Sequence, residues 1–190
     1  MTLDVASKET DDRDLINSIT EGDTKAFSRF YQLYEKRIFV FIQKKLNDPF
    51  DAADILHEVF MEVWKNAGRF EGRSKVSTWV FGIAFHKTVD RLRKKIPIPT
   101  DDDYTLQLVD NTPSALEILN TADENIHLQN CVDKLKPDQK IVIQLAFFED
   151  MAYGEIASVI ERPEGTVKTR IFYAKQALKH CLAKLIGAKR

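Results

Sequence analysis

Four carboxylates in the first third of the chain are spaced as if on one side of a helix. Asp51, Asp54, Glu58 and Glu62 follow at steps of three and four residues, and Trp64 stands at their end. Neighbouring like charges on a helix repel each other by roughly 0.2–0.5 kcal/mol per pair. Catalysis or metal binding requires further ligands that converge from other elements, and the sequence supplies none. A structural helix gains nothing from such repulsion, so the stripe predicts a docking face for a basic protein partner.

A second group of residues has the pattern of a helix-turn-helix. The run Tyr153-Gly154-Glu155-Ile156-Ala157 predicts a short helix, and a tight turn leads to a longer helix whose first residue is Pro163. An ordinary amphipathic helix with a solvated basic side is the alternative, but the short helix and turn favour a DNA-recognition helix. Its predicted inward residues are Val167, Ile171, Ala174, Leu178 and Leu182. Its predicted outward residues are Glu164, Lys168, Thr169, Phe172, Tyr173 and Lys175.

Residues 69–95 mix aromatic and basic side chains. Aromatic rings can stack on unpaired bases while cations follow the phosphate backbone, a combination typical of single-strand binding. The same composition also fits core aromatics beside a solvated basic face, and composition alone leaves both interpretations open. Trp79 itself fits the core better. The aromatics are Phe70, Trp79, Phe81 and Phe85, and the bases are Arg69, Arg73, Lys75, Lys87, Arg91, Arg93, Lys94 and Lys95.

The net charge of −1 hides a strong segregation of charge. Residues 69–95 carry eight bases and two acids, and residues 162–190 carry eight bases and one acid. Three other stretches, 1–24, 46–62 and 99–124, have net charges of −5, −5 and −7. The basic blocks suit phosphate, whereas the acidic stretches need a different role.

Composition excludes several classes of protein. A chain of 190 residues with 44% hydrophobic residues forms one domain or two small ones, and no stretch is apolar enough to cross a bilayer. The acidic N-terminus is neither a secretory signal nor a transit peptide. Cys131 and Cys181 stand fifty positions apart without a CxxC motif, which favours two reduced cysteines over a disulfide or metal site. We therefore expect a cytoplasmic protein without metal, cofactor or catalytic residues.

Apolar spacing predicts an all-α fold of two small helical domains. Steps of three and four from Phe27 to Ile42 indicate one helix, with Asp23 as its N-cap. Further helices are expected at 51–67, 77–95, 121–135, 138–149, 152–160 and 163–186. The predicted parts are an acidic N-terminal tail at 1–13, a first domain at 14–96, a flexible acidic linker at 97–120 and a second domain at 121–190.

Two motifs resemble the bacterial sigma-70 family, and the two-domain size resembles its extracytoplasmic-function group. Three segments of this chain resemble region two of the family: the run from Asp51 to Phe60, then Thr78-Trp79-Val80-Phe81, and then Asp90-Arg91-Leu92-Arg93. Region four is similar to the Tyr153 to Ala157 run and to Pro163 to Arg170. The two motifs occur in the order found in that family, and the resemblance covers residues from about 14 to 180.

The resemblance implies an RNA polymerase sigma factor, which is not an enzyme, and gives each surface a role. The implied partners are core RNA polymerase (β′ clamp and β subunits), promoter DNA and an anti-sigma factor, without small-molecule substrate or membrane insertion. The residues implied in docking on core polymerase are Asp51, Asp54, Glu58, Glu62 and Trp64. Those implied at the −10 element are Arg69, Phe70, Arg73, Ser74, Lys75, Trp79, Phe85, His86, Arg91 and Arg93. Those implied at the −35 element are Glu164, Gly165, Thr166, Lys168, Thr169, Arg170, Phe172, Tyr173 and Lys175.

The chain departs from the family pattern at several of these positions. His57 replaces a usual glutamine, Phe85-His86 replaces a common Arg-Asn pair, and Tyr173 replaces a frequent arginine. We therefore expect an unusual −35 preference. Two rival functions stay open on sequence grounds: a stand-alone helix-turn-helix regulator that binds operator DNA, and an all-α protein-interaction module with incidental charged patches.

Overall fold

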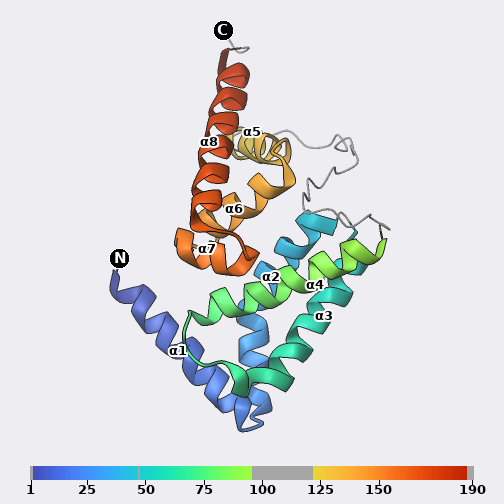
Figure 1. The fold of residues 1–190 in the computed structure, drawn as a ribbon, viewed down its shortest axis with the longest axis vertical. Helices are drawn as coiled ribbons and strands as arrows, with labels where there is room; N and C mark the ends of the chain where they lie inside the picture. The colour runs from blue at the N-terminus through green and yellow to red at the C-terminus, as the bar shows by residue number, and fades with distance from the viewer. Residues whose placement is uncertain (1, 47, 96–121, 188–190) are drawn as a thin grey trace. The chain divides into compact units, whose positions relative to one another are not determined.

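The computed structural model describes residues 2–46, 48–95 and 122–187, and every regular element in these ranges is a helix (Figure 1). The expected all-α fold is therefore confirmed for the described residues, and the predicted linker at 97–120 lies outside them. One compact unit contains α1 (Thr2–Thr20), α2 (Thr24–Leu46), α3 (Pro49–Asn66), the 3-10 helix η1 (Ala67–Arg69) and α4 (Val76–Lys95). The other contains α5 (Ala122–Asp133), α6 (Pro137–Phe147) and α8 (Glu164–Gly187). Helix α7 (Tyr153–Ile160) precedes α8 in the chain, and Gly154–Glu161 group with the first unit.

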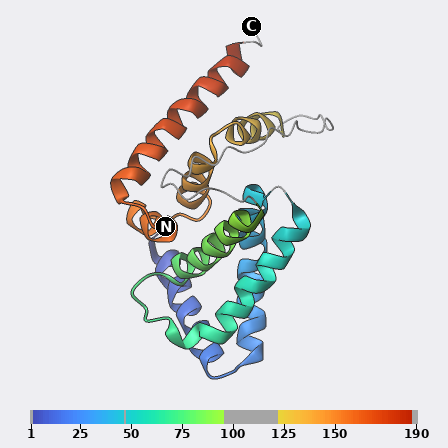
Figure 2. The same ribbon diagram turned by 45° about the vertical axis from the view of Figure 1, so that its right-hand side comes forward.

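Helix α2 forms the centre of the first unit. The backbone N–H groups of Lys25 and Ala26 donate to Asp23 Oδ1 at 2.7 and 3.2 Å, so the predicted N-cap is confirmed. Side chains at steps of four along the helix are fully buried, namely Phe30, Tyr34, Ile38 and Ile42. Helices α1, α3 and α4 all pack against α2, and the views in Figures 1 and 2 show them around it.

Helix α1 differs from the expected acidic tail, because it begins at Thr2 and packs on α2. Its apolar side chains Leu15, Ile16 and Ile19 are buried. The buried carboxylate of Asp12 accepts a hydrogen bond of 2.5 Å from the Tyr34 hydroxyl. Burial, and then this hydrogen bond, raise the pKa of Tyr34 above its ordinary value. An acidic residue counted as tail is thus part of the core of the first unit.

The second unit has a small core in which α5 and α6 pack on α8. Leu135, Ile143 and Ala174 are buried together, and Leu178 packs against them. The predicted inward stripe of α8 is confirmed for Val167, Ile171 and Ala174, which are fully buried, whereas Leu178 and Leu182 are half-buried. This packing leaves the opposite side of α8 to solvent.

A disulfide joins Cys131 of α5 to Cys181 of α8, with their Cα atoms 5.8 Å apart. The expectation of two reduced cysteines is therefore wrong for this structure. Because α5 and α8 lie against each other, residues fifty positions apart in the chain become neighbours in space. The number of residues between two cysteines does not determine their distance in the folded protein. The spacing of Cys131 and Cys181 therefore led to a wrong prediction of their redox state.

Candidate protein and nucleic-acid interfaces

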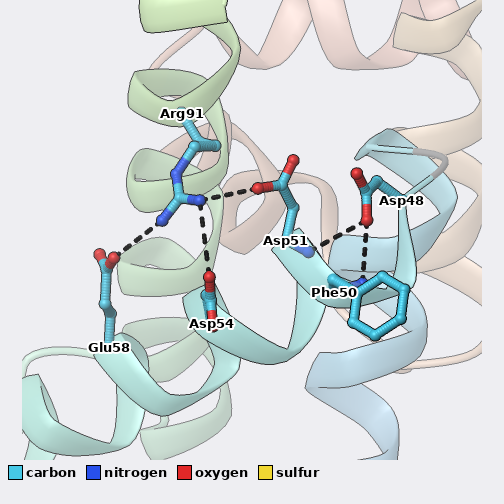
Figure 3. Close-up of polar contacts among 6 residues, drawn as sticks. All are labelled: Asp48, Phe50, Asp51, Asp54, Glu58 and Arg91. Carbon is cyan, nitrogen blue, oxygen red and sulfur yellow. Dashed lines mark hydrogen bonds and ion pairs between the residues drawn. The ribbon is translucent and has the colours of Figure 1, made fainter.

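Helix α3 carries the acidic residues and begins with a defined cap. The Asp48 carboxylate accepts hydrogen bonds from the backbone N–H groups of Phe50 and Asp51, at 2.9 and 3.2 Å (Figure 3). Pro49 stands in the first turn, where its missing N–H costs no helical hydrogen bond. The apolar residues are buried, namely Ala52, Ile55, Leu56, Val59, Phe60 and Val63. The acidic side chains therefore lie on the remaining sides of the helix.

Arg91 of α4 neutralises part of the acidic stripe from within the protein. Its guanidinium lies 2.8 Å from Asp51, 3.1 Å from Glu58 and 4.0 Å from Asp54 (Figure 3). Burial alone lowers the pKa of Arg91, but hydrogen bonds and attraction from Asp51 and Glu58 outweigh it and raise that pKa. The side chain of Asp51 is only 14% exposed, so its carboxylate faces Arg91 more than solvent.

A second cation of α4 reaches the same row of carboxylates. Lys87 Nζ lies 3.4 Å from Glu62 Oε2, and the Asn66 amide donates to Glu62 Oε1 at 2.6 Å. The expectation that a structural helix gains nothing from these acids is wrong, because α4 supplies their counter-ions. We call the five residues that join the two helices the α3–α4 seam: Asp51, Glu58, Glu62, Lys87 and Arg91.

The other two predicted docking residues lie differently. The side chain of Asp54 is 73% exposed, and its carboxylate is at the limit of reach of Arg91. Trp64 is half-buried, and its ring packs edge-on against Phe27 of α2 with centroids 5.0 Å apart. Trp64 therefore supports the contact between α2 and α3, while Asp54 points to solvent.

The aromatic residues predicted at the −10 element are only partly open to solvent. The rings of Phe70 and Trp79 pack at a centroid distance of 5.3 Å. Lys45 Nζ lies 4.0 Å from the centre of the Phe85 ring, and the neighbouring His86 is exposed. The half-buried members of the predicted set are Phe70, Ser74, Lys75, Trp79, Phe85 and Arg91. His86 is the most accessible ring of the set.

Three cations of the predicted −10 set are exposed. Arg69 ends η1, Arg73 lies in the loop before α4, and Arg93 lies in the last turn of α4. Arg73 pairs with Glu71 at 2.6 Å, and Arg93 lies 3.7 Å from Asp90. Ion pairs between exposed groups are weak in water, so these guanidinium groups can exchange partners. Arg91 differs from them because the α3–α4 seam holds it.

Helix α8 begins one residue later than expected. The Pro163 carbonyl accepts hydrogen bonds from the N–H groups of Thr166 and Val167, at 2.9 and 3.3 Å. Pro163 therefore caps the helix, and Glu164 is its first residue. The preceding turn contains Glu161 at φ 51°, in the left-handed region, which sharply redirects the chain after α7. The short helix, turn and long helix that the sequence predicts are all present.

The outward side of α8 combines exposed aromatics with paired charges. Lys168 Nζ lies 2.7 Å from Glu164, and the hydrogen bond to Glu164 raises the pKa of Lys168. Phe172 and Tyr173 are exposed, with ring centroids 5.5 Å apart. Arg170 is held at 2.6 Å by Asp138 of α6. The exposed members of the predicted −35 set are Glu164, Gly165, Lys168, Thr169, Phe172, Tyr173 and Lys175, whereas Thr166 and Arg170 are half-buried.

Comparison with known proteins identifies the family. Residues 30–96 match the model of sigma-70 region 2, and residues 127–178 match that of sigma-70 region 4. The chain is 30% identical over 159 residues to the ECF RNA polymerase sigma factor RpoE of Cereibacter sphaeroides, covering 83% of this chain and 86% of that protein. The chain belongs to the extracytoplasmic-function sigma factors. A second relative, the ECF RNA polymerase sigma factor SigW of Bacillus subtilis, is 29% identical over 90% of this sigma factor and 96% of its own length.

Solved structures agree on the fold of this sigma factor. CnrH in complex with the cytosolic domain of CnrY matches with a TM-score of 0.64 and 19% identity, over 92% of this chain and 98% of that one. The sigma factor RpoE in complex with the anti-sigma factor NepR from Bartonella quintana matches with a TM-score of 0.61 and 20% identity, over 84% and 98% of the two chains. As a sigma factor, the protein binds core RNA polymerase and promoter DNA and directs transcription initiation.

Two features of the sigma factor's surfaces escaped sequence reasoning. Lys87 pairs with Glu62, although the sequence placed it only within a basic block. Phe50 is 84% exposed beside the acidic residues, although helical periodicity gave no reason to single it out.

Within the described ranges, no helix is long and apolar enough to cross a membrane. Those ranges also contain no group of three His, Cys, Asp or Glu residues that could hold a metal ion.

Proposed function

We propose that α3 docks this sigma factor on the β′ clamp of core polymerase, with further contacts to the β subunits. Asp54 carries its charge toward solvent, and Glu58 and Glu62 are partly open beside it. A cationic partner gains attraction from these carboxylates, whereas DNA is repelled by them. Asp51 and Trp64 contribute by holding α3 in place against α4 and α2.

The −10 element meets the loop before α4 and the exposed side of that helix. Arg69, Arg73 and Arg93 are exposed cations suited to phosphates, and His86 offers a ring and a hydrogen-bonding edge to an unpaired base. The half-buried residues of the predicted set form the support beneath them. Arg91 acts through the α3–α4 seam instead of through a phosphate, because two carboxylates already hold its guanidinium.

The −35 element meets the outward side of α8 in the major groove. The helix N-terminus and Lys168 suit a phosphate, while Thr169, Phe172 and Tyr173 face base edges or a thymine methyl group. Arg170 positions the helix through Asp138. With Tyr173 in place of an arginine, apolar or stacking contacts replace a bidentate guanine contact at that position.

An anti-sigma factor holds the protein inactive until a signal arrives. Support comes from a similar sigma factor, RpoE, whose structure was solved in complex with the anti-sigma factor NepR. The protein acts in the cytoplasm as a specificity subunit and catalyses no reaction of its own. Polymerase supplies the chemistry of RNA synthesis.

The observation that carries the proposal is the division of charge over separate helices. The exposed carboxylates on α3 suit a basic protein surface, whereas the exposed cations beside α4 and on α8 suit the phosphates of DNA. The decisive experiment adds the purified protein to sigma-free core polymerase and measures initiation on a library of promoters. We expect specific start sites that depend on the added protein. Operator binding without stimulation of core polymerase would instead favour a stand-alone helix-turn-helix regulator.

A further inference from the structure

A buried cation stands among the core residues of α2. Phe41 and Lys45 lie about one turn apart on this helix, and their exposed fractions are only 2% and 6%. Phe41 packs edge-on against Phe81 of α4, with ring centroids 5.3 Å apart. Four residues further along both helices, Lys45 Nζ lies 4.0 Å from the centre of the Phe85 ring. The second contact thus joins a cation to a ring where the first joins two rings.

A lysine at this buried position needs a physical explanation. An apolar side chain would extend the core of the first unit, whereas a buried ammonium group loses its hydration. Two features of the site offset part of that loss. The face of an aromatic ring attracts a cation, and the attraction is stronger away from water. Lys45 also lies in the last turn of α2, at the negative end of the helix dipole. The structure therefore holds a charge where packing alone favours an apolar residue.

The Phe85 ring links Lys45 to a side chain that is proposed to meet DNA. Phe85 is half-buried, and the next residue, His86, is exposed. Their rings meet edge to face, with centroids 5.7 Å apart and planes at 81°. Because the ammonium group lies over the face of Phe85, rotation of that ring would lose the attraction. Lys45 thereby restricts the plane of Phe85 and, with it, the arrangement of the two rings.

From these contacts, we infer that Lys45 is a positioning residue for base recognition at the −10 element. It acts through Phe85 and contacts no phosphate, because its own side chain is buried. The inference rests on the proposed function, in which Phe85 and His86 belong to the −10 set. Loss of the Lys45 charge should therefore weaken the choice between bases without removing a phosphate contact.

The test measures base preference in holoenzyme assembled from full-length protein and core polymerase, on a promoter library that varies only the −10 element. Lys45→Met keeps a long apolar side chain and removes the charge. We expect it to reduce discrimination between preferred and other bases about three- to tenfold, the size of a weak to moderate cation–π contact. The slope of log K against log salt should stay that of the parent. Lys45→Arg should restore the preference, since a guanidinium group also stacks on aromatic faces.

Two further variants test the link between the residues. Lys44→Met is the matched control, because it removes the same charge from the same turn of α2 at a half-buried position. It should keep the parent's preference. Phe85→Leu should change the preference at the same positions as Lys45→Met, and the double variant should show no further change, because the ring is already gone. Phe85→Leu also tests the link if Lys45→Met does not fold.

Separate readouts distinguish the outcomes. A Lys45→Met protein with a lower thermal midpoint and the parent's base preference would overturn the inference and leave Lys45 a purely structural role. A reduced salt slope would also overturn it, because that result indicates a phosphate contact. The parent's preference in Phe85→Leu would remove the residue through which Lys45 is inferred to act. A parent that forms no promoter-specific holoenzyme would refute the proposed function, and the inference with it.

Discussion

The guanidinium of Arg91 lies 2.8 Å from the carboxylate of Asp51 and joins two helices for which the sequence predicts different partners. Asp51 belongs to the helix proposed to meet polymerase, and Arg91 to the helix proposed to meet the −10 element. Glu58 holds the second nitrogen of the same guanidinium at 3.1 Å. A cation that two carboxylates already hold gains little from a phosphate. We therefore assign Arg91 a structural role and distinguish it from the cations proposed to bind DNA.

Arg91 can be distinguished from a phosphate-binding residue by the salt dependence of promoter binding. Removing a cation that binds one phosphate reduces the slope of log K against log salt by about 0.7–0.9. Arg91→Met should leave that slope unchanged, because the side chain neutralises carboxylates within the protein. Arg93→Met is the control: Arg93 is exposed, and its removal should reduce the slope by about that amount. An equal reduction for both variants would return Arg91 to the DNA-binding set.

The α3–α4 seam should also be visible as an energetic coupling. Arg91→Met leaves the little-exposed Asp51 carboxylate without its main partner, which should cost about 1–3 kcal/mol of unfolding free energy. A double-mutant cycle with Asp51→Asn should give a coupling free energy of about 0.5–3 kcal/mol. The same cycle between Arg91 and Asp90 should give almost none, since Asp90 pairs with Arg93. Additive effects in the first cycle would mean that the ion pair stabilises nothing.

The Tyr34–Asp12 hydrogen bond predicts an alkaline loss of stability. The pKa of Tyr34 is raised in the folded state above its ordinary value of 10.0, first by burial and then by Asp12. Its contribution is therefore fully present below about pH 10 and declines as pH rises further, because the unfolded chain then releases a proton that the folded chain keeps. Thermal midpoints measured against pH should fall more steeply above pH 10 for the parent than for Tyr34→Phe. Parallel curves would contradict the assignment.

The Cys131–Cys181 disulfide predicts a redox-dependent stability of the second unit. A cross-link that closes a loop of fifty residues stabilises by about 4 kcal/mol in the chain-entropy model. Reductant should lower the unfolding midpoint of the parent to that of the Cys131→Ser, Cys181→Ser double variant and leave the variant itself unchanged. Alkylation of the unfolded protein should label both cysteines only after reduction. Labelling without reductant would show that the bond does not form in solution.

Two residues of α8 should affect −35 binding in different ways. Lys168→Ala should weaken binding to all −35 sequences alike and reduce the salt slope, since a phosphate contact carries no sequence information. Tyr173→Ala should change the preferred sequence, because the ring is exposed and we propose that it contacts bases. Lys179→Ala serves as the control, because this exposed lysine lies further along the helix and outside the proposed set. A Tyr173→Ala variant with the parent's preference would remove its reading role.

Much of the fold could be predicted because apolar spacing reports directly on burial. The interval from Phe27 to Ile42 predicts α2, and the helices that follow start or end within a few residues of their predicted positions. The packing of helix α1 was not predicted, because one of its buried residues is an acid. The Asp12 carboxylate is buried where it accepts a hydrogen bond from the Tyr34 hydroxyl. No property of the N-terminal segment alone reveals such a partner.

The candidate surfaces were harder to predict, because periodicity says which residues share one side of a helix but not what lies opposite. It grouped four acids in a single stripe, namely Asp51, Asp54, Glu58 and Glu62. In the structure, cations of α4 form ion pairs with three of them: Asp51, Glu58 and Glu62. Only the packing of α3 on α4 separates Asp54 from the rest. The pairing of Cys131 with Cys181 is likewise a property of how α5 meets α8.

The ion pair between Asp138 and Arg170 joins α6 to α8 within the protein itself, without any contribution from DNA. Since α6 packs on α8 by this contact and by their shared core, we expect the helix proposed to read the −35 element to need no further ordering when it binds DNA. If α8 reads the −35 element, we expect mismatched sites to be released quickly, because a helix that is already ordered has no slow rearrangement to complete on binding.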